Sequence, residues 1–252
     1  MVSDLKGGSA VVTGAASGIG RATVNVLLRE GMQVVGVDRD ELGLKELVLE
    51  SGTGVIAVVA DLADREQVLR ATEDAVARVG HVRLLVNVAG VGYRADIVNT
   101  TDDEYDVMFN VNVRAVFLTC RFFIPHMLEH GGGVIVNVAS SLAVKAARER
   151  AIYAATKGAV VSMTRSITVD FGARGIRANC VAPGTTDTPW IGKILAGAAN
   201  PAELRSQMES RQAVGRLGRA EEIAEVVRFL ASDAASFVHG AVIAVDGGQT
   251  AW

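Results

Sequence analysis

The stretch SAVVTGAASGIGRA, residues 9–22, decides the fold because its pattern changes twice over a short distance. An apolar run at 9–13 is followed by three closely spaced glycines, and the helical pattern of RATVNVLLRE begins directly after them. A buried strand that passes through a glycine turn into a helix is typical of the first strand–helix unit of a parallel α/β sheet.

The rest of the chain repeats this alternation. Near-continuously apolar runs recur at 33–37, 55–59, 83–88, 133–138, 177–181 and 241–245, as expected for strands buried on both faces of a parallel sheet. The segments between them have helical periodicity with charged outer faces. No linker or repeat divides the chain, so we predict one α/β domain over 1–252, a Rossmann-type doubly wound parallel sheet of about seven strands with helices on both faces.

One long connection departs from this alternation of predicted strands and helices. Residues 185–202 lack strong periodicity, and a connection of this length is usually functional. We therefore predict a loop that acts as a lid and, with the residues up to about 212, contacts substrate.

Composition excludes several classes of function. The 252 residues are 50% hydrophobic, which is ample for a buried core, and the net charge of -3 argues against nucleic-acid binding. The N-terminus has no signal-peptide pattern and no apolar run approaches about 18 residues, so we expect a cytoplasmic protein without a membrane partner. Cys120 and Cys180 are predicted to be buried thiols, and neither they nor the four histidines have a metal-ligand spacing.

The glycine turn is a candidate dinucleotide site. Gly14, Gly18 and Gly20 permit a tight turn and a close backbone approach, and the helix N-terminus offers unpaired N–H groups to a pyrophosphate. Ser17 and Ile19 belong to the same turn and are assigned to the cofactor with it. An ordinary strand–helix turn can also use glycine, but the position at the first such turn favours the cofactor.

The ends of the next two strands supply acidic residues for the same cofactor. Asp38 lies eighteen residues beyond Gly20, where a carboxylate can accept hydrogen bonds from both adenosine ribose hydroxyls. A 2′-phosphate there would meet like charge, so we predict NAD rather than NADP, although the adjacent Arg39 could soften that repulsion. Asp61, with Leu62 beside it, either accepts from the adenine amino group or caps the following helix.

A tyrosine and a lysine one helical turn apart are the candidate acid–base pair. Tyr153 and Lys157 share one helix face, so the Lys157 ammonium can lower the pKa of the Tyr153 phenol toward neutrality. Ser140 follows the fifth predicted strand, at the edge where an open α/β sheet builds its crevice, and can hold a substrate oxygen beside the Tyr153 hydroxyl.

Taken together, these residues resemble the short-chain dehydrogenase/reductase superfamily over essentially the whole chain. The matching features in family order are TGAASGIG at 13–20, Asp38, Asp61, NVAG at 87–90, NVN at 110–112, Ser140, YAATK at 153–157, APG at 182–184 and the segment from GRLGRAEE to VDGG at 215–248. One departure is Val88, where the family commonly has a second asparagine.

The resemblance implies a catalytic tetrad of Asn112, Ser140, Tyr153 and Lys157. In it Tyr153 transfers the proton, Ser140 positions the reacting oxygen, Lys157 holds the nicotinamide ribose and lowers the tyrosine pKa, and Asn112 supports a water in the proton relay. The same resemblance assigns further residues to the cofactor, namely Asn87, Ala89, Gly90, Pro183, Gly184, Thr186 and Thr188. It also implies a homotetramer, in which Trp252 would pack at a subunit contact.

Within the superfamily the chain looks most like cytosolic-type 3-hydroxybutyrate dehydrogenases and 2-keto-3-deoxy sugar acid (fuconate or rhamnonate) dehydrogenases. There the arginines matching Arg150 and Arg211 bind a substrate carboxylate, which agrees with the bidentate pairing of guanidinium and carboxylate. Both could instead be solvated surface charges, as we expect of Arg148. Trp190 either covers the substrate or packs the lid.

Three hypotheses follow. The first is an NAD-dependent secondary-alcohol dehydrogenase acting on a small hydroxy acid or keto-deoxy sugar acid. The second is an NADPH-dependent 3-ketoacyl or general carbonyl reductase, against which Asp38 argues. The third is a catalytically silent dinucleotide-binding sensor or scaffold, against which the complete tetrad argues.

Overall fold

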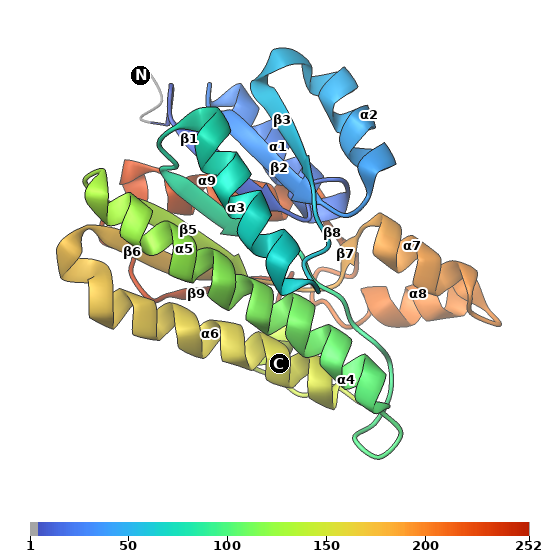
Figure 1. Ribbon diagram of the computed structural model, residues 1–252. Coiled ribbons are helices and arrows are strands. Elements are labelled where there is room, and N and C mark those ends of the chain that lie inside the picture. The colour runs from blue at the N-terminus through green and yellow to red at the C-terminus, as the bar shows by residue number, and fades with distance from the viewer. Residues whose placement is uncertain (1–4, 252) are drawn as a thin grey trace.

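Seven parallel strands form the central sheet in the order β3-β2-β1-β4-β5-β6-β9 (Figure 1). The computed structural model describes residues 5–251. Each predicted strand is present, and the bounds differ from the predicted ones by at most two residues: β1 (Ser9–Thr13), β2 (Gln33–Asp38), β3 (Val55–Val59), β4 (Leu84–Asn87), β5 (Gly133–Val138), β6 (Ile176–Pro183) and β9 (Val242–Val245). The predicted fold class is confirmed. The order reverses between β1 and β4, and such a switch point opens a crevice at the carboxyl ends of the strands.

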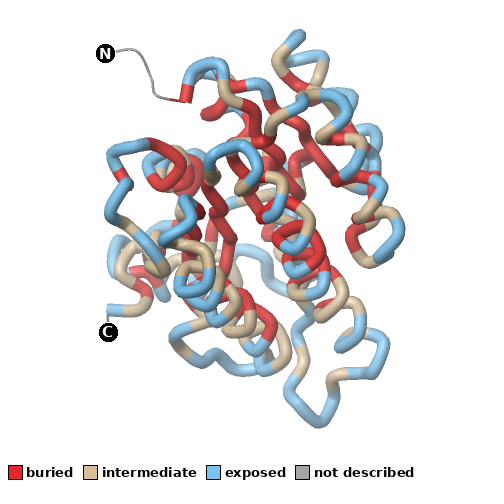
Figure 2. Tube along the Cα trace, turned by 60° about the vertical axis from the view of Figure 1, so that its left-hand side comes forward, coloured by how far each residue is buried: buried red, intermediate tan, exposed pale blue. Residues whose placement is uncertain are grey.

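Helices cover both faces of this sheet and enclose two cores. On one face, β-strand residues pack against α3 (Arg65–Val79), α5 (Ala115–Glu129) and α6 (Ala151–Phe171). On the other, they pack against α1 (Gly18–Arg29), α2 (Glu41–Ser51) and α9 (Ala220–Ala231). Figure 2 shows the buried residues running through the middle of the molecule between these layers.

One long helix on the first face has an apolar composition. Helix α4 (Asp102–Phe109) continues through a π-helical turn, Asn110–Arg114, into α5, and this 28-residue helix is long and apolar enough to cross a membrane by length and composition alone. It contains no uninterrupted apolar run of spanning length, because Arg114 and Arg121 lie within it. Its most apolar window has a mean hydropathy of 1.4 and is 56% buried inside the protein, so core packing accounts for its composition.

The segment predicted as a loop is largely helical, and that prediction was wrong. Residues 185–212 contain α7 (Pro189–Ala196) and α8 (Pro201–Glu209), and together these form a helical hairpin that projects from the body (Figure 1). Each helix has proline in its first turn, where the ring presets φ and no hydrogen bond is lost. The hairpin has a small core of its own around Ile191, Met208 and Leu217, and the pairing of β7 (Thr186–Asp187) with β8 (Gly218–Arg219) closes its base.

The cysteine prediction is confirmed, since Cys120 and Cys180 are both buried and unpaired. Burial raises the pKa of the Cys120 thiol to about 12 and that of Cys180 to about 11, so neither is a reactive thiolate. Across residues 5–251 no three His, Cys, Asp or Glu side chains are grouped in a way that could hold a metal ion.

Candidate active site

A first hollow, of about 510 Å³, opens at the carboxyl ends of β1, β2, β3 and β4. The structure brings most of the predicted cofactor residues together around it: Gly14, Ser17, Gly18, Ile19, Gly20, Asp38, Arg39, Asp61, Leu62, Ala89, Gly90 and Thr188. We call it the cofactor hollow.

The geometry of the glycine turn suits a dinucleotide phosphate. Gly14 has φ +70°, and a Cβ there would lie 2.9 Å from the Ala89 Cα, while a Cβ on Gly20 would lie 1.9 Å from the Gly14 carbonyl oxygen. Ser17 is the N-cap of α1 but makes no side-chain hydrogen bond to the helix. The first amides of α1 are therefore free to bind an anion in the hollow.

Asp38 and Asp61 line the same hollow. Asp38 accepts hydrogen bonds from the backbone N–H groups of Ala16 at 3.1 Å and Asp40 at 3.0 Å, which fix its carboxylate at the end of β2. Asp61 accepts from the Ala63 N–H at 2.9 Å. Because the N-cap of α3 is Asp64, the alternative role of Asp61 as that helix cap is wrong.

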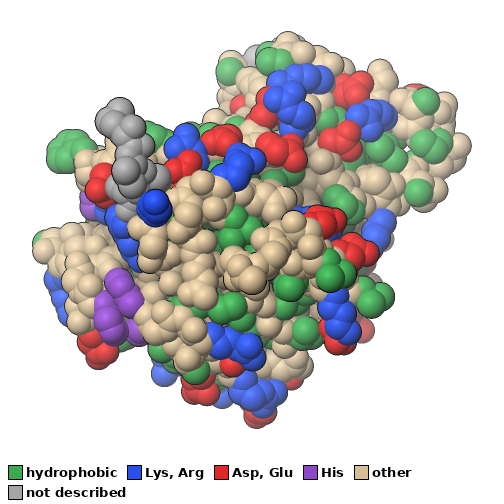
Figure 3. Space-filling model, turned by 90° about the horizontal axis from the view of Figure 1, so that it is seen from above, with side chains coloured by type: hydrophobic (Ala, Val, Ile, Leu, Met, Phe, Trp, Pro, Cys, Tyr) green, Lys and Arg blue, Asp and Glu red, His purple; other side chains and the backbone are tan. Residues whose placement is uncertain are grey.

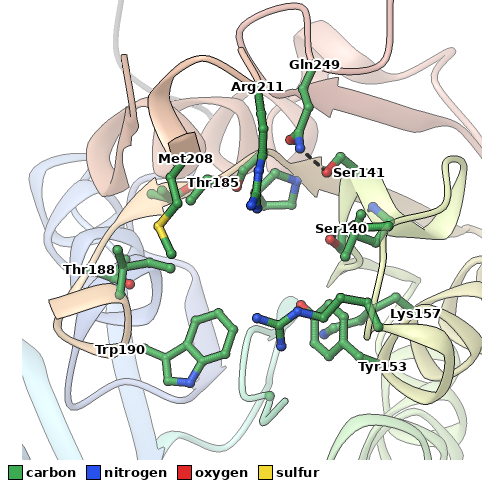
Figure 4. A pocket seen from close by; sticks show the side chains of 18 of the residues that line it. Ser140, Ser141, Tyr153, Lys157, Thr185, Thr188, Trp190, Met208, Arg211 and Gln249 are labelled. Atoms are coloured by element: carbon green, nitrogen blue, oxygen red, sulfur yellow. Dashed lines mark hydrogen bonds between the residues drawn. The ribbon is translucent and has the colours of Figure 1, made fainter. Parts of the chain in front are cut away.

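A second hollow, of about 540 Å³, adjoins the first and holds the predicted acid–base residues (Figure 4). Ser140 follows β5, and its Oγ accepts from the Leu142 N–H at 3.1 Å, which leaves the hydroxyl proton for the Tyr153 oxygen. Lys157 is only 4% exposed, and its Nζ donates to the Val138 carbonyl at 2.9 Å. We call this space the substrate hollow.

Burial controls the protonation of this pair. Although Tyr153 keeps some surface toward the hollow, burial raises its pKa and outweighs the lowering by the Ser140 hydrogen bond and the Arg150 charge. The expected lowering of the Tyr153 pKa is therefore wrong in this structure. Burial also lowers the pKa of Lys157 to about 8. Tyr153 is thus protonated at neutral pH and suited to donate a proton to a substrate oxygen.

Two predicted site residues do not reach either hollow. The fully buried Asn112 amide donates to the Val91 carbonyl and to Thr156, and its Oδ1 accepts from the Val91 N–H at 2.8 Å. Its side chain thus anchors the loop after β4, and any support of a relay water would have to come from its backbone. Asn87 bonds to Asn137 at 2.9 Å and to Thr119 at 2.9 Å inside the protein. Its side chain joins strands and does not line the cofactor hollow.

The chain after β6 forms one wall of the substrate hollow. Pro183, Gly184, Thr186 and Thr188 all line it, and of these four residues, which the resemblance assigns to the cofactor, Thr188 also lines the cofactor hollow. Trp190 on α7 lines both hollows and remains 43% exposed, so it does more than pack the hairpin internally.

Arg150, Arg148 and Arg211 all line the substrate hollow. Arg150 is partly buried, donates to the Tyr93 carbonyl at 3.0 Å and lies 5.9 Å from the centre of the Trp190 ring, so it is not a freely solvated charge. Burial lowers the Arg150 pKa, and the positive charge of Arg211 acts in the same direction. Arg148 is exposed, as expected of a surface charge, and it also lines the hollow.

Arg211 follows α8 and points into the substrate hollow, as Figure 4 shows. Arg211 is exposed and lies just beyond the end of α8, so it is a surface charge that also lines the hollow. No acidic side chain within residues 5–251 forms an ion pair with Arg150 or Arg211.

Several polar residues of the substrate hollow carry no mark in the sequence. Ser141 and Lys145 line it from the loop after β5, and Gln249 lines it from the turn after β9. Lys145 donates to the Gln249 carbonyl at 2.7 Å across 104 positions of sequence, and no local pattern marks such a contact. Trp252, expected at a subunit contact, lies outside the described residues.

Comparisons with known proteins agree with this architecture. The family model described as Enoyl-(Acyl carrier protein) reductase matches residues 14–250. The rat protein named Dehydrogenase/reductase SDR family member 6 is 36% identical over 97% of this chain and 98% of its own length. Cis-4-hydroxycyclohexanecarboxylate dehydrogenase of Sinomonas cyclohexanicum is 40% identical over 96% of each chain.

Solved structures add the spatial match. The crystal structure of 3-ketoacyl-(acyl-carrier-protein) reductase from Brucella melitensis complexed with NADH superposes with a TM-score of 0.91. It is 34% identical and covers 98% of this chain and 100% of its own.

Proposed function

Because the chain belongs to the short-chain dehydrogenase/reductase family, we propose that this CH–OH oxidoreductase uses NAD(H) to interconvert a secondary alcohol and a ketone on a small carboxylate-bearing substrate. The substrate class is a hydroxy acid or a keto-deoxy sugar acid, as in the 3-hydroxybutyrate and 2-keto-3-deoxy sugar acid dehydrogenases that the sequence resembles. A homotetramer in the cytoplasm is part of the same proposal.

The charge of the substrate hollow carries the proposal. Every charged side chain that lines it is basic: Arg94, Lys145, Arg148, Arg150, Lys157 and Arg211. Elsewhere, on the face seen in Figure 3, basic and acidic side chains are interspersed. A partly enclosed space with cations and no acid attracts an anion, and the two guanidinium groups of Arg150 and Arg211 can hold a carboxylate bidentately.

The residues divide the chemistry among them. Tyr153 donates its proton to the ketone oxygen, or takes the proton back from the alcohol, while the Ser140 hydroxyl holds that oxygen by a second hydrogen bond. The Lys157 ammonium lies 5.9 Å from the centre of the Tyr153 ring and would hold the nicotinamide ribose, as the family resemblance implies. When bound, the dinucleotide supplies or accepts the hydride.

NAD is favoured by Asp38, which lines the cofactor hollow with its carboxylate fixed by two backbone hydrogen bonds. A 2′-phosphate near that carboxylate would be repelled. The name of the Sinomonas relative includes a hydroxy acid, which supports the proposed substrate class. The Brucella neighbour is a 3-ketoacyl reductase complexed with NADH, so a ketoacyl reductase is the second candidate. Arg39 also lines the cofactor hollow, where its positive charge would favour the 2′-phosphate of NADPH.

A substrate screen tests the proposal. NAD reduction would be followed with short hydroxy acids and sugar acids, with their neutral alcohol counterparts, and with NADP in place of NAD. We expect turnover of acids with NAD, and we expect Arg150→Met to raise KM for acids at least about tenfold, the effect of losing one charge-assisted hydrogen-bonded pair.

The control is the same variant on neutral alcohols, for which KM should change little. Equal activity of the wild type on acids and neutral alcohols, together with no effect of Arg150→Met, would remove the carboxylate proposal. Activity confined to 3-ketoacyl thioesters with NADPH would establish the second candidate instead.

A further inference from the structure

Gln249 is a buried amide in the wall of the substrate hollow. It belongs to the turn after β9, is 5% exposed and lines the hollow, where Figure 4 shows it beside Ser141. No role for it follows from the acid–base chemistry. A polar side chain that is buried usually has hydrogen-bond partners for its polar atoms. An atom of it that lacks a protein partner can therefore bind a ligand.

Only one end of the Gln249 amide is occupied by the protein. The Ser141 hydroxyl donates to the Gln249 Oε1 at 3.1 Å, so the carbonyl end of the amide faces the loop after β5. Within residues 5–251 the Gln249 Nε2 has no hydrogen-bond partner. Because the Nε2 group carries two N–H donors, the free end of this amide presents donors and no acceptor.

The backbone around Gln249 is held firmly. The Lys145 ammonium donates to the Gln249 carbonyl at 2.7 Å, and the Gln249 N–H donates to the Asp246 carbonyl at 3.1 Å. The Asp246 carboxylate accepts from the N–H groups of Gly248 at 3.0 Å and Thr250 at 2.8 Å on either side. The donor is therefore preorganised, which reduces the entropy lost when it binds an acceptor.

We propose that Gln249 forms a hydrogen-bond donor subsite that selects substrates carrying a further oxygen, such as a second hydroxyl, away from the reacting carbon. The inference rests on the proposed function, because it takes the second hollow as the substrate site. The arginines already offer charge to a carboxylate, whereas a neutral amide suits a hydroxyl or carbonyl oxygen.

The substrate class therefore narrows to polyhydroxy acids. A substrate without the second oxygen leaves the Gln249 Nε2 donor without a partner in the complex. A site that is built to bind an oxygen discriminates against its absence more strongly than an apolar pocket discriminates against a missing methylene.

The test compares matched pairs of secondary hydroxy acids that differ by one distal hydroxyl, such as 3-hydroxypentanoate and 3,5-dihydroxypentanoate. We expect wild type to prefer the dihydroxy members. Gln249→Leu should lower kcat/KM for them about tenfold, mainly through KM, and for the monohydroxy members about twofold or less. Gln249→Glu keeps the size and the acceptor for Ser141 but loses the donors, so it should lose the same preference even if the leucine variant fails to fold.

Gln212→Leu is the matched control. Gln212 is also buried, at 3% exposure, and its Nε2 donates to the Arg216 carbonyl, but it does not line the hollow. The inference is overturned if Gln249→Leu affects both members of each pair equally, if Gln212→Leu reproduces the loss, or if wild type prefers the monohydroxy acids. Failure of wild type to turn over any hydroxy acid would instead overturn the proposed function, and the inference with it.

Discussion

Replacing Lys157 by methionine should stabilise the folded protein while removing its activity. Lys157 is 4% exposed, and burial lowers its pKa from 10.5 to about 8. A drop of about 2.5, at about 1.36 kcal/mol for each pH unit, means that burying the charge costs about 3 kcal/mol below pH 8. Methionine fills similar space without that cost, but it leaves the Val138 carbonyl without its donor, which costs about 1 kcal/mol.

The expected gain in the free energy of unfolding is therefore about 2 kcal/mol at pH 7. Its pH dependence follows from the protons bound. Between about pH 8 and 10.5 the unfolded chain keeps a proton on Lys157 that the folded protein has released. The stability contributed by this group in wild type consequently rises with pH across that window. The methionine variant should therefore lose its greater free energy of unfolding within this pH window, and above the window it should be slightly less stable than wild type.

Urea unfolding of wild type and Lys157→Met at a series of pH values measures this difference directly, because other titrating groups cancel between the two proteins. Lys6→Met is the control, since Lys6 is exposed, and its difference from wild type should not vary with pH. A Lys157→Met difference that stays constant from pH 7 to 10.5 would refute the reasoning. So would a variant less stable than wild type at pH 7.

Three further predictions use the two hollows. Tyr153→Phe should lower turnover at least about a hundredfold while NADH binding, followed by fluorescence, is retained; unchanged turnover would show that Tyr153 is not the acid. Gly20→Ala places a Cβ 1.9 Å from the Gly14 carbonyl oxygen, so it should cost at least about 2 kcal/mol in thermal or urea unfolding and weaken NADH binding, whereas Gly192→Ala, with open space around the new Cβ, should cost nothing. Asp38→Ser should narrow the preference for NADH over NADPH about tenfold in fluorescence titrations, and an unchanged ratio would contradict the role of this carboxylate.

The sheet was predictable because its residues carry strong local signals. The strand from Ser9 to Thr13 and its six counterparts are near-continuously apolar. The glycines that follow the first of them are typical of a tight strand–helix turn. The hairpin α7–α8 was not predicted because both helices are short. Pro189 and Pro201 each lie at a helix start. Proline is equally typical of loops, so its presence does not distinguish a helix start from a loop.

The sequence likewise predicts some features of the site and not others. Gly14, Asp38, Ser140 and Tyr153 follow strands or share a helix face, so chain order alone places them near one edge of the sheet. The orientation of a side chain at such an edge is a tertiary property, which is why Asn87 turned out to point into the protein. Contacts across more than a hundred positions of sequence, such as Lys145 with Gln249, depend on the finished fold.

The separate small core of the helical hairpin α7–α8 has a consequence for local opening. Ile191, Met208 and Leu217 pack with Ile194, Leu195 and Leu204 and form a cluster distinct from the two cores that flank the sheet. A unit with its own few apolar contacts can open without the rest of the protein, so amide hydrogens of α7 and α8 should exchange with solvent deuterium well before those of β1 and β5. Trp190 and Arg211 lie within or beside this unit and would move with it, which gives substrate a way in and out of the hollow without disturbing Ser140 and Tyr153 on the rigid side.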